Sequence, residues 1–143
     1  MNASTTVHLA GALFSGEGKL LLLRRLDTVW ELPHGTLEFG EEPEIGLARI
    51  FAELTGIDIA PDRPVGAWSV LTASGDRHIH EVHIGYTVTL SGALLAVELD
   101  AERHGAFAWI HQHELAEKID TPTMRKACER AFGMLARTRK NRG

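Results

Sequence analysis

Apolar residues recur at helical spacing in the middle of the chain. The stripe falls at positions i, i+3, i+4 and i+7 and consists of Leu47, Ile50, Phe51 and Leu54. Such a stripe is typical of an amphipathic helix that packs one side against a core. Pro43 suits the first helical turn, and Gly56 suits a left-handed cap at the C-terminal end. The pattern therefore predicts a helix over residues 42–55.

Runs of apolar and β-branched residues on both sides of this helix predict β-strands. The expected strands cover residues 7–14, 19–24, 65–71, 78–90 and 106–110. Glycine-containing turns at 16–18 and 74–76 indicate hairpin connections. A final helix is expected from Pro122 to about Arg139, with Thr121 as its N-cap. Strands, helix, strands and helices in this order predict an α+β layered fold.

The composition is that of one globular domain covering residues 1–143. A chain of 143 residues that is 44% hydrophobic and 24% charged can bury a core without disulfides. The sequence has no run of about 18 apolar residues and no signal-like N-terminal pattern, so we expect no membrane span and a cytoplasmic location. The single Cys128 excludes an internal disulfide, agrees with a reducing compartment, and is expected to be a small buried side chain.

Basic residues gather at the C-terminal end of the chain. Residues 125–143 hold seven lysines and arginines and one acid, Glu129, although the whole chain has a net charge of -4. A basic tail can contact nucleic acid. The simpler interpretation is a solvated helix end, where cations stabilise the last turn through the helix dipole. We therefore do not expect nucleic-acid binding.

Glycines, acids and one arginine recur at fixed distances around the predicted helix. The spaced residues are Gly35, Glu41, Arg49, Phe51, Glu53, Gly56 and Ile57. This spacing resembles the Nudix box, whose family pattern is G-x5-E-x7-R-E-U-x-E-E-x-G-U, with U a bulky apolar residue. Ile50 and Leu54 stand where the family carries glutamates. Residues 30–33 are similar to the family's W-x-L-P-G-G lead-in, in which His34 replaces the first glycine.

The resemblance implies a fold and an activity. The expected fold is the Nudix-type α/β/α sandwich, with a mixed β-sheet between helices. The expected activity is hydrolysis of a nucleoside diphosphate linked to another group, with Mg²⁺ or Mn²⁺ held by helix glutamates. Positions 50, 53 and 54 share one face of the helix, so only Glu53 remains of three converging carboxylates. We therefore expect a depleted site that binds Mg²⁺ or Mn²⁺ weakly and has weak activity.

The same resemblance implies roles for individual residues. Glu53 would hold the metal, assisted by Glu38 or Glu41 from the loop before the helix. Glu41, Glu53 and Arg49 form the expected catalytic set, in which Arg49 orients the carboxylates. Acids outside the box that could add a ligand or activate water are Glu81, Glu98 and Glu102.

The substrate is expected at the mouth of the box loop, where His34, Gly35 and Glu38 are the candidates for binding it. His34 replaces a small residue, so its side chain should point towards the substrate or fill part of its space. The ligand would be a diphosphate-containing small molecule whose identity the sequence does not determine. The sequence does not determine the oligomeric state. A homodimer is one candidate, because dimers are common among proteins with this motif.

Histidines support two alternative functions. Three of them surround Glu81 on a predicted strand and are His78, His80 and His83. A repurposed Nudix enzyme could use His34 or the group His80, Glu81 and His83 for acid–base chemistry without a metal cofactor. A non-catalytic Nudix-like domain could instead bind a ligand. The simplest interpretation of the strand histidines is partial exposure to water.

Overall fold

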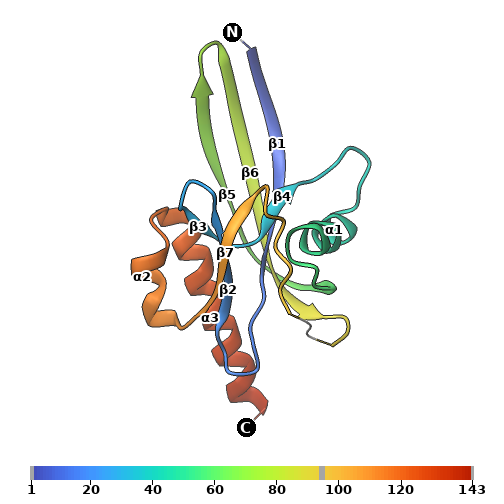
Figure 1. Cartoon of the computed structure of the whole chain (residues 1–143), viewed down its shortest axis with the longest axis vertical. Helices are drawn as coiled ribbons and strands as arrows, with labels where there is room; N and C mark the ends of the chain where they lie inside the picture. Colours follow the sequence, from blue (N-terminus) through green and yellow to red (C-terminus); the bar gives the residue numbers. More distant parts are fainter. Residues whose placement is uncertain (1, 94–95, 143) are drawn as a thin grey trace.

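The computed structural model describes residues 2–93 and 96–142, which form two sheets and several helices (Figure 1). The elements in chain order are β1 (Asn2–Ala12), β2 (Leu20–Arg25), β3 (Trp30–Glu31), β4 (His34–Thr36), α1 (Pro43–Thr55), β5 (Ile59–Ser74), β6 (Arg77–Leu90), β7 (His104–Ile110), a 3-10 helix η1 (Gln112–Glu114), α2 (Leu115–Lys118) and α3 (Pro122–Arg142). None of the helices in this described part has the length and apolarity needed to cross a bilayer.

The strands form one mixed sheet and one antiparallel sheet. The four-stranded sheet has the order β4-β1-β6-β5, and the three-stranded sheet has the order β3-β2-β7. Within the larger sheet β1 runs parallel to β6 and antiparallel to β4, whereas β5 and β6 form an antiparallel hairpin. Helix α1 lies on one side of the strands and helices α2 and α3 lie on the other (Figure 1). The chain therefore has the predicted α+β architecture, with a mixed sheet between helices.

Strand β2 contributes side chains to two hydrophobic cores, one on each face of its sheet. Its four leucines, from Leu20 to Leu23, are all fully buried, as expected for a strand covered on both faces. Leu21 and Leu23 belong to the core under α1, while Leu20 and Leu22 belong to the core under α2 and α3. A continuous apolar run, rather than an alternating one, is the sequence signature of this two-sided burial.

Helix α1 packs closely on β1. Ile50 and Leu54 are each 2% exposed and lie in the core with Phe51. A Cβ atom added to Gly11 of β1 would lie 2.4 Å from the Phe51 ring, so glycine at this position lets the helix approach the sheet. The helix ends where Gly56 adopts a left-handed conformation with φ 71° and donates its N–H to the Ala52 carbonyl. Both the predicted helix and its cap are confirmed.

The predicted strands are confirmed, but two of them are longer than expected. β1 begins at Asn2 instead of residue 7, and β5 covers Ile59–Ser74 instead of residues 65–71. Both strands flank β6, and backbone hydrogen bonding to β6 continues beyond the apolar part of each sequence. Polar side chains carry no strand pattern, so sequence analysis could not detect these extensions. The long β5–β6 hairpin and the start of β1 project away from the helices (Figure 1).

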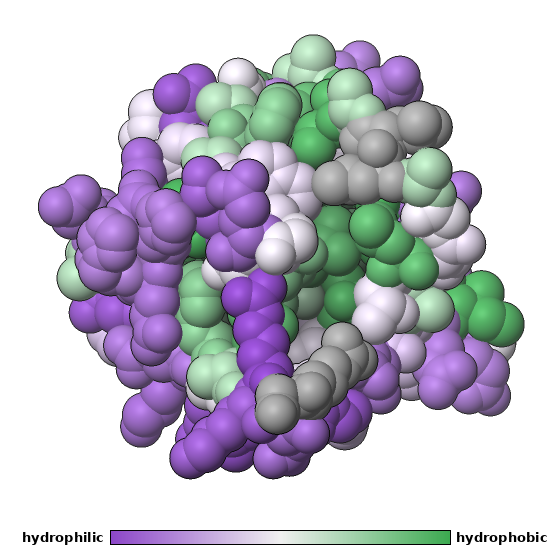
Figure 2. All heavy atoms as spheres, turned by 90° about the horizontal axis from the view of Figure 1, so that it is seen from below, coloured by the Kyte–Doolittle hydropathy of each residue, from purple (hydrophilic) through white to green (hydrophobic). Residues whose placement is uncertain are grey.

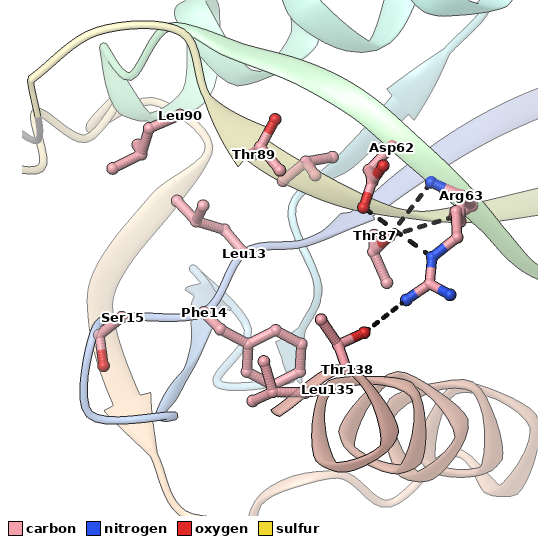
Figure 3. Close-up of a pocket in the computed structure, with 11 residues that line it drawn as sticks. Leu13, Phe14, Ser15, Asp62, Arg63, Thr87, Thr89, Leu90, Leu135 and Thr138 are labelled. Atoms are coloured by element: carbon pink, nitrogen blue, oxygen red, sulfur yellow. Dashed lines mark hydrogen bonds and ion pairs between the residues drawn. The ribbon is translucent and has the colours of Figure 1, made fainter. Parts of the chain in front are cut away.

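The opposite end of the molecule, seen from below, has hydrophobic side chains lining a hollow between more polar surfaces (Figure 2). A pocket of about 300 Å³ lies between the β1–β2 connection, the end of β6 and helix α3. Figure 3 shows its two kinds of wall, with Phe14 and Leu135 on the apolar side and Arg63 on the polar side. Arg63 donates through Nη2 to Thr138 Oγ1 at 2.9 Å. None of the predicted site residues lines this pocket.

Candidate functional site

Arg49 of α1 lies at the centre of the box residues. Its Nε donates to Glu41 Oε2 at 2.8 Å and its Nη2 donates to Glu41 Oε1 at 3.0 Å, which is a two-point ion pair. Nη2 also donates to the Thr36 carbonyl at 3.0 Å, and Nη1 donates to Glu53 Oε2 at 3.3 Å. One guanidinium group therefore ties the helix to strand β4 and to the loop that joins them.

Three carboxylates converge on this guanidinium. Glu38 Oε1 lies 3.7 Å from Arg49 Nη1, and the Glu38 N–H donates to Glu41 Oε1 at 3.1 Å. The hydrogen bonds from Arg49 and from the Glu38 backbone lower the pKa of Glu41, and the pairing raises the pKa of Arg49 above its already high value. The structure thus brings together four of the predicted site residues, which are Glu38, Glu41, Arg49 and Glu53.

Ile50 and Leu54 face the protein interior instead of this carboxylate group. A Cβ atom on Gly35 would lie 3.0 Å from Cγ1 of Ile50, so Gly35 is in close packing contact with the helix residue. Glu53, next to Leu54 in sequence, keeps a side chain that is 46% exposed. The predicted apolar stripe, with Ile50 and Leu54 in the core, is therefore confirmed, and the exposed Glu53 lies beside it on the acidic rim.

Among the described residues, none of the acids proposed from outside the box forms an ion pair with Arg49. The Glu98 N–H donates to the Thr55 carbonyl at 2.8 Å, which places Glu98 at the C-terminal end of α1. Glu102 donates its N–H to Asp100 Oδ1 at 3.1 Å. Glu81 lies among histidines on β6. A second cation lies beside the rim, because Arg103 Nη1 is 3.9 Å from Glu53 Oε2.

The rim has the donor chemistry of a site for a single hard dication. Both oxygens of Glu41 are engaged by Arg49, whereas the side chains of Glu38 and Glu53 are largely open to solvent. Mg²⁺ is commonly bound by one or two carboxylates while it keeps several waters. Glu38 and Glu53 therefore fit one Mg²⁺ or Mn²⁺ ion, with fewer protein ligands than an intact box would offer.

His34 does not face the rim. Because side chains alternate along β4, His34 points to the face of the sheet opposite Gly35 and helix α1. Its Nε2 is hydrogen-bonded to Glu31 Oε2 at 2.7 Å, and His104 Nε2 is hydrogen-bonded to Glu31 Oε1 at 3.1 Å. Burial raises the pKa of Glu31, but the hydrogen bonds from His104 and His34 outweigh it and lower that pKa to about 2. Glu31 is therefore an ionised carboxylate inside the protein.

Two further histidines lie beside His34. His8 and His83, with His34, form a group that we term the histidine cluster, and one nitrogen from each ring lies within 4.8 Å of the other two. Glu81 Oε1 lies 3.2 Å from His83 Nε2 and 3.5 Å from His8 Nε2. Trp68 of β5 stacks on the His83 ring with a centroid distance of 5.4 Å. Burial lowers the pKa of His8 and of His83, so both rings are neutral at pH 7.

The cluster corrects two expectations about the strand histidines. His83 is buried, although partial exposure to water was the simplest expectation. His80 is exposed on the opposite face of β6, so it cannot act together with Glu81 and His83 as one group. His8 was not identified from the sequence, because only the pairing of β1 with β6 brings it opposite His83.

Comparisons with known proteins identify the family and the fold. Residues 5–131 match the NUDIX domain family. A MutT-like protein from Streptomyces ambofaciens is 35% identical over 115 residues, which cover 80% of this chain and 69% of that protein. A MutT protein from Methanosarcina mazei Go1 has the same fold, with a TM-score of 0.73 and 20% identity over 95% of this chain and 98% of that one. The NUDIX domain of Shewanella oneidensis NrtR, solved with ADP ribose, has a TM-score of 0.70 and 18% identity, covering 92% and 89% of the two chains.

Proposed function

Because this chain belongs to the Nudix superfamily, as the match over residues 5–131 shows, we propose that it hydrolyses a nucleoside-diphosphate-linked small molecule with a depleted metal site. The observation that supports the proposal is the convergence of Glu38, Glu41 and Glu53 on Arg49. The three carboxylates, set against Arg49 and against Arg103 beside Glu53, leave a net charge of about -1 at the rim, which favours binding of a dication. Arg49 lies within 3.7 Å of all three carboxylates and holds them together.

Each rim residue has a distinct proposed task. Glu38 and Glu53 would hold Mg²⁺ or Mn²⁺, which would neutralise diphosphate charge and lower the pKa of a bound water. Glu41 would hold the Arg49 side chain in position, because both carboxylate oxygens of Glu41 bind the guanidinium. Gly35 would keep the β4 backbone close to the helix, since a larger residue would meet Ile50. The absence of carboxylates at positions 50 and 54 accounts for the weak activity that we expect.

We place the protein in the cytoplasm as part of the same proposal. Cys128 is a free thiol in the core under α3, and burial raises its pKa to about 12. A thiol with that pKa stays protonated and unreactive at neutral pH, so it supports a structural role in a reducing compartment.

The test is release of phosphate or nucleotide from a substrate panel. The panel contains nucleoside triphosphates, ADP-ribose, nucleotide sugars and dinucleoside polyphosphates, each with Mg²⁺, with Mn²⁺ and with EDTA. We expect turnover of at least one substrate class with a metal and none with EDTA. Glu53→Gln should reduce kcat/KM by at least about tenfold, which corresponds to about 1.4 kcal/mol of transition-state stabilisation.

The matched control is Glu129→Gln, which removes an exposed carboxylate of α3 far from the box and should leave turnover unchanged. If no substrate is turned over under any metal condition, the hydrolase proposal is wrong, and a repurposed enzyme and a ligand-binding domain are the remaining alternatives. If turnover survives both EDTA and Glu53→Gln, the rim does not carry the reaction.

A further inference from the structure

Three imidazole rings from three neighbouring strands meet on one face of the four-stranded sheet. His8 of β1 is directly opposite His83 of β6, and Ala10 of β1 is directly opposite His34 of β4. His8 and Ala10 are two residues apart, so their side chains lie on the same face. All three histidines therefore share the face that turns away from α1 and from the carboxylate rim.

The spacing of these groups matches a tetrahedral metal site. Bonds of 2.0–2.1 Å around a tetrahedral Zn²⁺ place neighbouring ligand atoms about 3.3–3.4 Å apart. Glu81 Oε1 already lies 3.2 Å from His83 Nε2 and 3.5 Å from His8 Nε2. The ring nitrogens lie within 4.8 Å of one another, so they need to approach by at most about 1.5 Å to reach that separation.

An unsatisfied nitrogen atom in the cluster points to a missing partner. The Nδ1 atom of His34 is buried and has no hydrogen-bond partner within residues 2–93 and 96–142, and buried polar atoms are nearly always paired. His8 and His83 turn Nε2 towards Glu81. A cation bound by Nε2 of His8 and His83, by Nδ1 of His34 and by Glu81 would supply the partner that His34 Nδ1 lacks.

Two carboxylates beside the histidine cluster fit a bound cation. His34 uses Nε2 to bind the ionised Glu31, which leaves Nδ1 free, and a carboxylate behind a histidine is the usual arrangement that orients a metal ligand. The carboxylates of Glu31 and Glu81 supply negative charge to balance a dication.

We propose that His8, His34 and His83, with Glu81 as fourth ligand, form a binding site for a divalent transition metal ion, for which Zn²⁺ is the best match. Imidazole ligands favour such ions over Mg²⁺, and a three-histidine, one-carboxylate set suits tetrahedral coordination. The site is separate from the rim and does not depend on the proposed hydrolysis. Its ion would connect β4, β1 and β6 across the middle of the sheet.

The test uses the full chain after treatment with a chelator and removal of that chelator. Titration with Zn²⁺ alone, followed by calorimetry, should give one high-affinity ion per chain. Titration with Co²⁺ should give the intense visible absorption of tetrahedral coordination. His8→Gln should weaken Zn²⁺ binding by at least about tenfold, and Glu31→Gln should weaken it by roughly 10–100-fold through loss of the oriented His34 ring.

Two control variants separate this site from surface binding. His111 and His113 stack on each other at the surface with a centroid distance of 5.4 Å. His80 is exposed on the face of β6 opposite the histidine cluster. The double variant His111→Gln with His113→Gln, and the single variant His80→Gln, should bind Zn²⁺ as the native chain does. Circular dichroism establishes that each variant is folded.

Three results would overturn the proposal. They are absence of tight Zn²⁺ binding to the native chain, a weak octahedral Co²⁺ spectrum, and loss of binding in the surface variants but not in His8→Gln. The first two use only the native chain, so a misfolded variant does not prevent a decision. All three are measured without substrate, so they are independent of whether diphosphate hydrolysis is found.

Discussion

At the scale of single residues, Arg49 controls the position of the acidic rim. A guanidinium can bind both oxygens of a carboxylate and a carbonyl at once, whereas an ammonium group offers no planar fork. Glu41 and Thr36 are bound in this way, and Glu53 is held by the third nitrogen. The resemblance to the Nudix box predicted that Arg49 would orient the carboxylates. Helical spacing accounts only for Arg49 and Glu53, which are four residues apart on α1, whereas Glu41 comes from the loop before the helix.

Replacing Arg49 with lysine should therefore loosen the loop without unfolding the chain. Arg49→Lys should lower the free energy of unfolding by about 1 kcal/mol, since the pair is partly solvent-screened. The pKa of Glu41 should rise towards its ordinary value, because the Arg49 hydrogen bonds are the largest cause of its lowering. Urea denaturation and carboxylate NMR titration measure the two effects. An unchanged Glu41 pKa would show that the ion pair does not persist in solution.

Restoring a family glutamate should damage the protein. Ile50 is 2% exposed, so Ile50→Glu would bury a carboxylate without a partner and should cost at least about 3 kcal/mol of unfolding free energy. Ile45 lies on the same helix with 65% exposure, so Ile45→Glu should change stability by no more than about 0.5 kcal/mol. Urea denaturation at neutral pH measures both. A stable Ile50→Glu variant with tighter Mg²⁺ binding would mean that position 50 can reach the rim.

The histidine cluster marks the limit of what the sequence could reveal at this scale. His34 was identified because it departs from a motif, and Glu81 was identified as a neighbour of His83 on one strand. His8 lies in an ordinary strand with no motif around it. Its role depends on which strand pairs with β1, and that pairing follows from the assembled sheet, not from local sequence.

At the scale of elements, helix α1 depends on one glycine in β1. A Cβ atom on Gly11 would lie 2.4 Å from Cε2 of Phe51 and 3.1 Å from Cγ1 of Val88. Gly11→Ala should therefore force α1 away from the sheet and cost about 1–3 kcal/mol of unfolding free energy. Gly16→Ala is the control, because no atom lies within 4 Å of its added Cβ. Equal stability of the two variants, measured by thermal or urea denaturation, would contradict close packing of α1 on β1.

The elements themselves were largely predictable, and the exceptions have physical causes. Helix α1 combines a regular apolar stripe with a proline start and a glycine cap, so three local signals agree. Strand β4 is only three residues long and lies within a motif loop, so no periodicity could identify it. The start of β1 is polar and is a strand only because β6 provides its hydrogen bonds.

At the scale of the whole molecule, the buried histidines and Glu31 make stability depend on pH. Burial lowers the pKa of His8 and His83 below 6.5, so the unfolded chain takes up protons first as the pH falls below that value. Glu31 has a pKa of about 2 in place of 4.5, so its contribution is complete above pH 4.5 and is lost towards pH 2. Both effects destabilise the protein in acid.

The unfolding free energy should accordingly be greatest near neutral pH and fall in two stages on acidification. Urea denaturation of the metal-free chain, in the presence of EDTA, at a series of pH values between about 7.5 and 3 measures the profile. His8→Gln should reduce the first stage, between about pH 7 and 5, and leave the second. A profile that is flat between about pH 7.5 and 5.5 would show that His8 and His83 titrate normally in the folded protein.

The pairing of β1 with β6 also constrains the order in which the chain can fold. Each β1 residue pairs with the residue 75 positions later, since Asn2 is opposite Arg77 and Ala12 is opposite Thr87. On the ribosome, β1 is synthesised well before β6, the strand with which it pairs. Closing a loop of that length is also entropically costly. The first strand to be made should therefore be among the last to acquire protected amides, whereas the β5–β6 hairpin, joined by a short turn, can form early. Pulsed hydrogen exchange during refolding would detect that order, and early protection of β1 amides would exclude it.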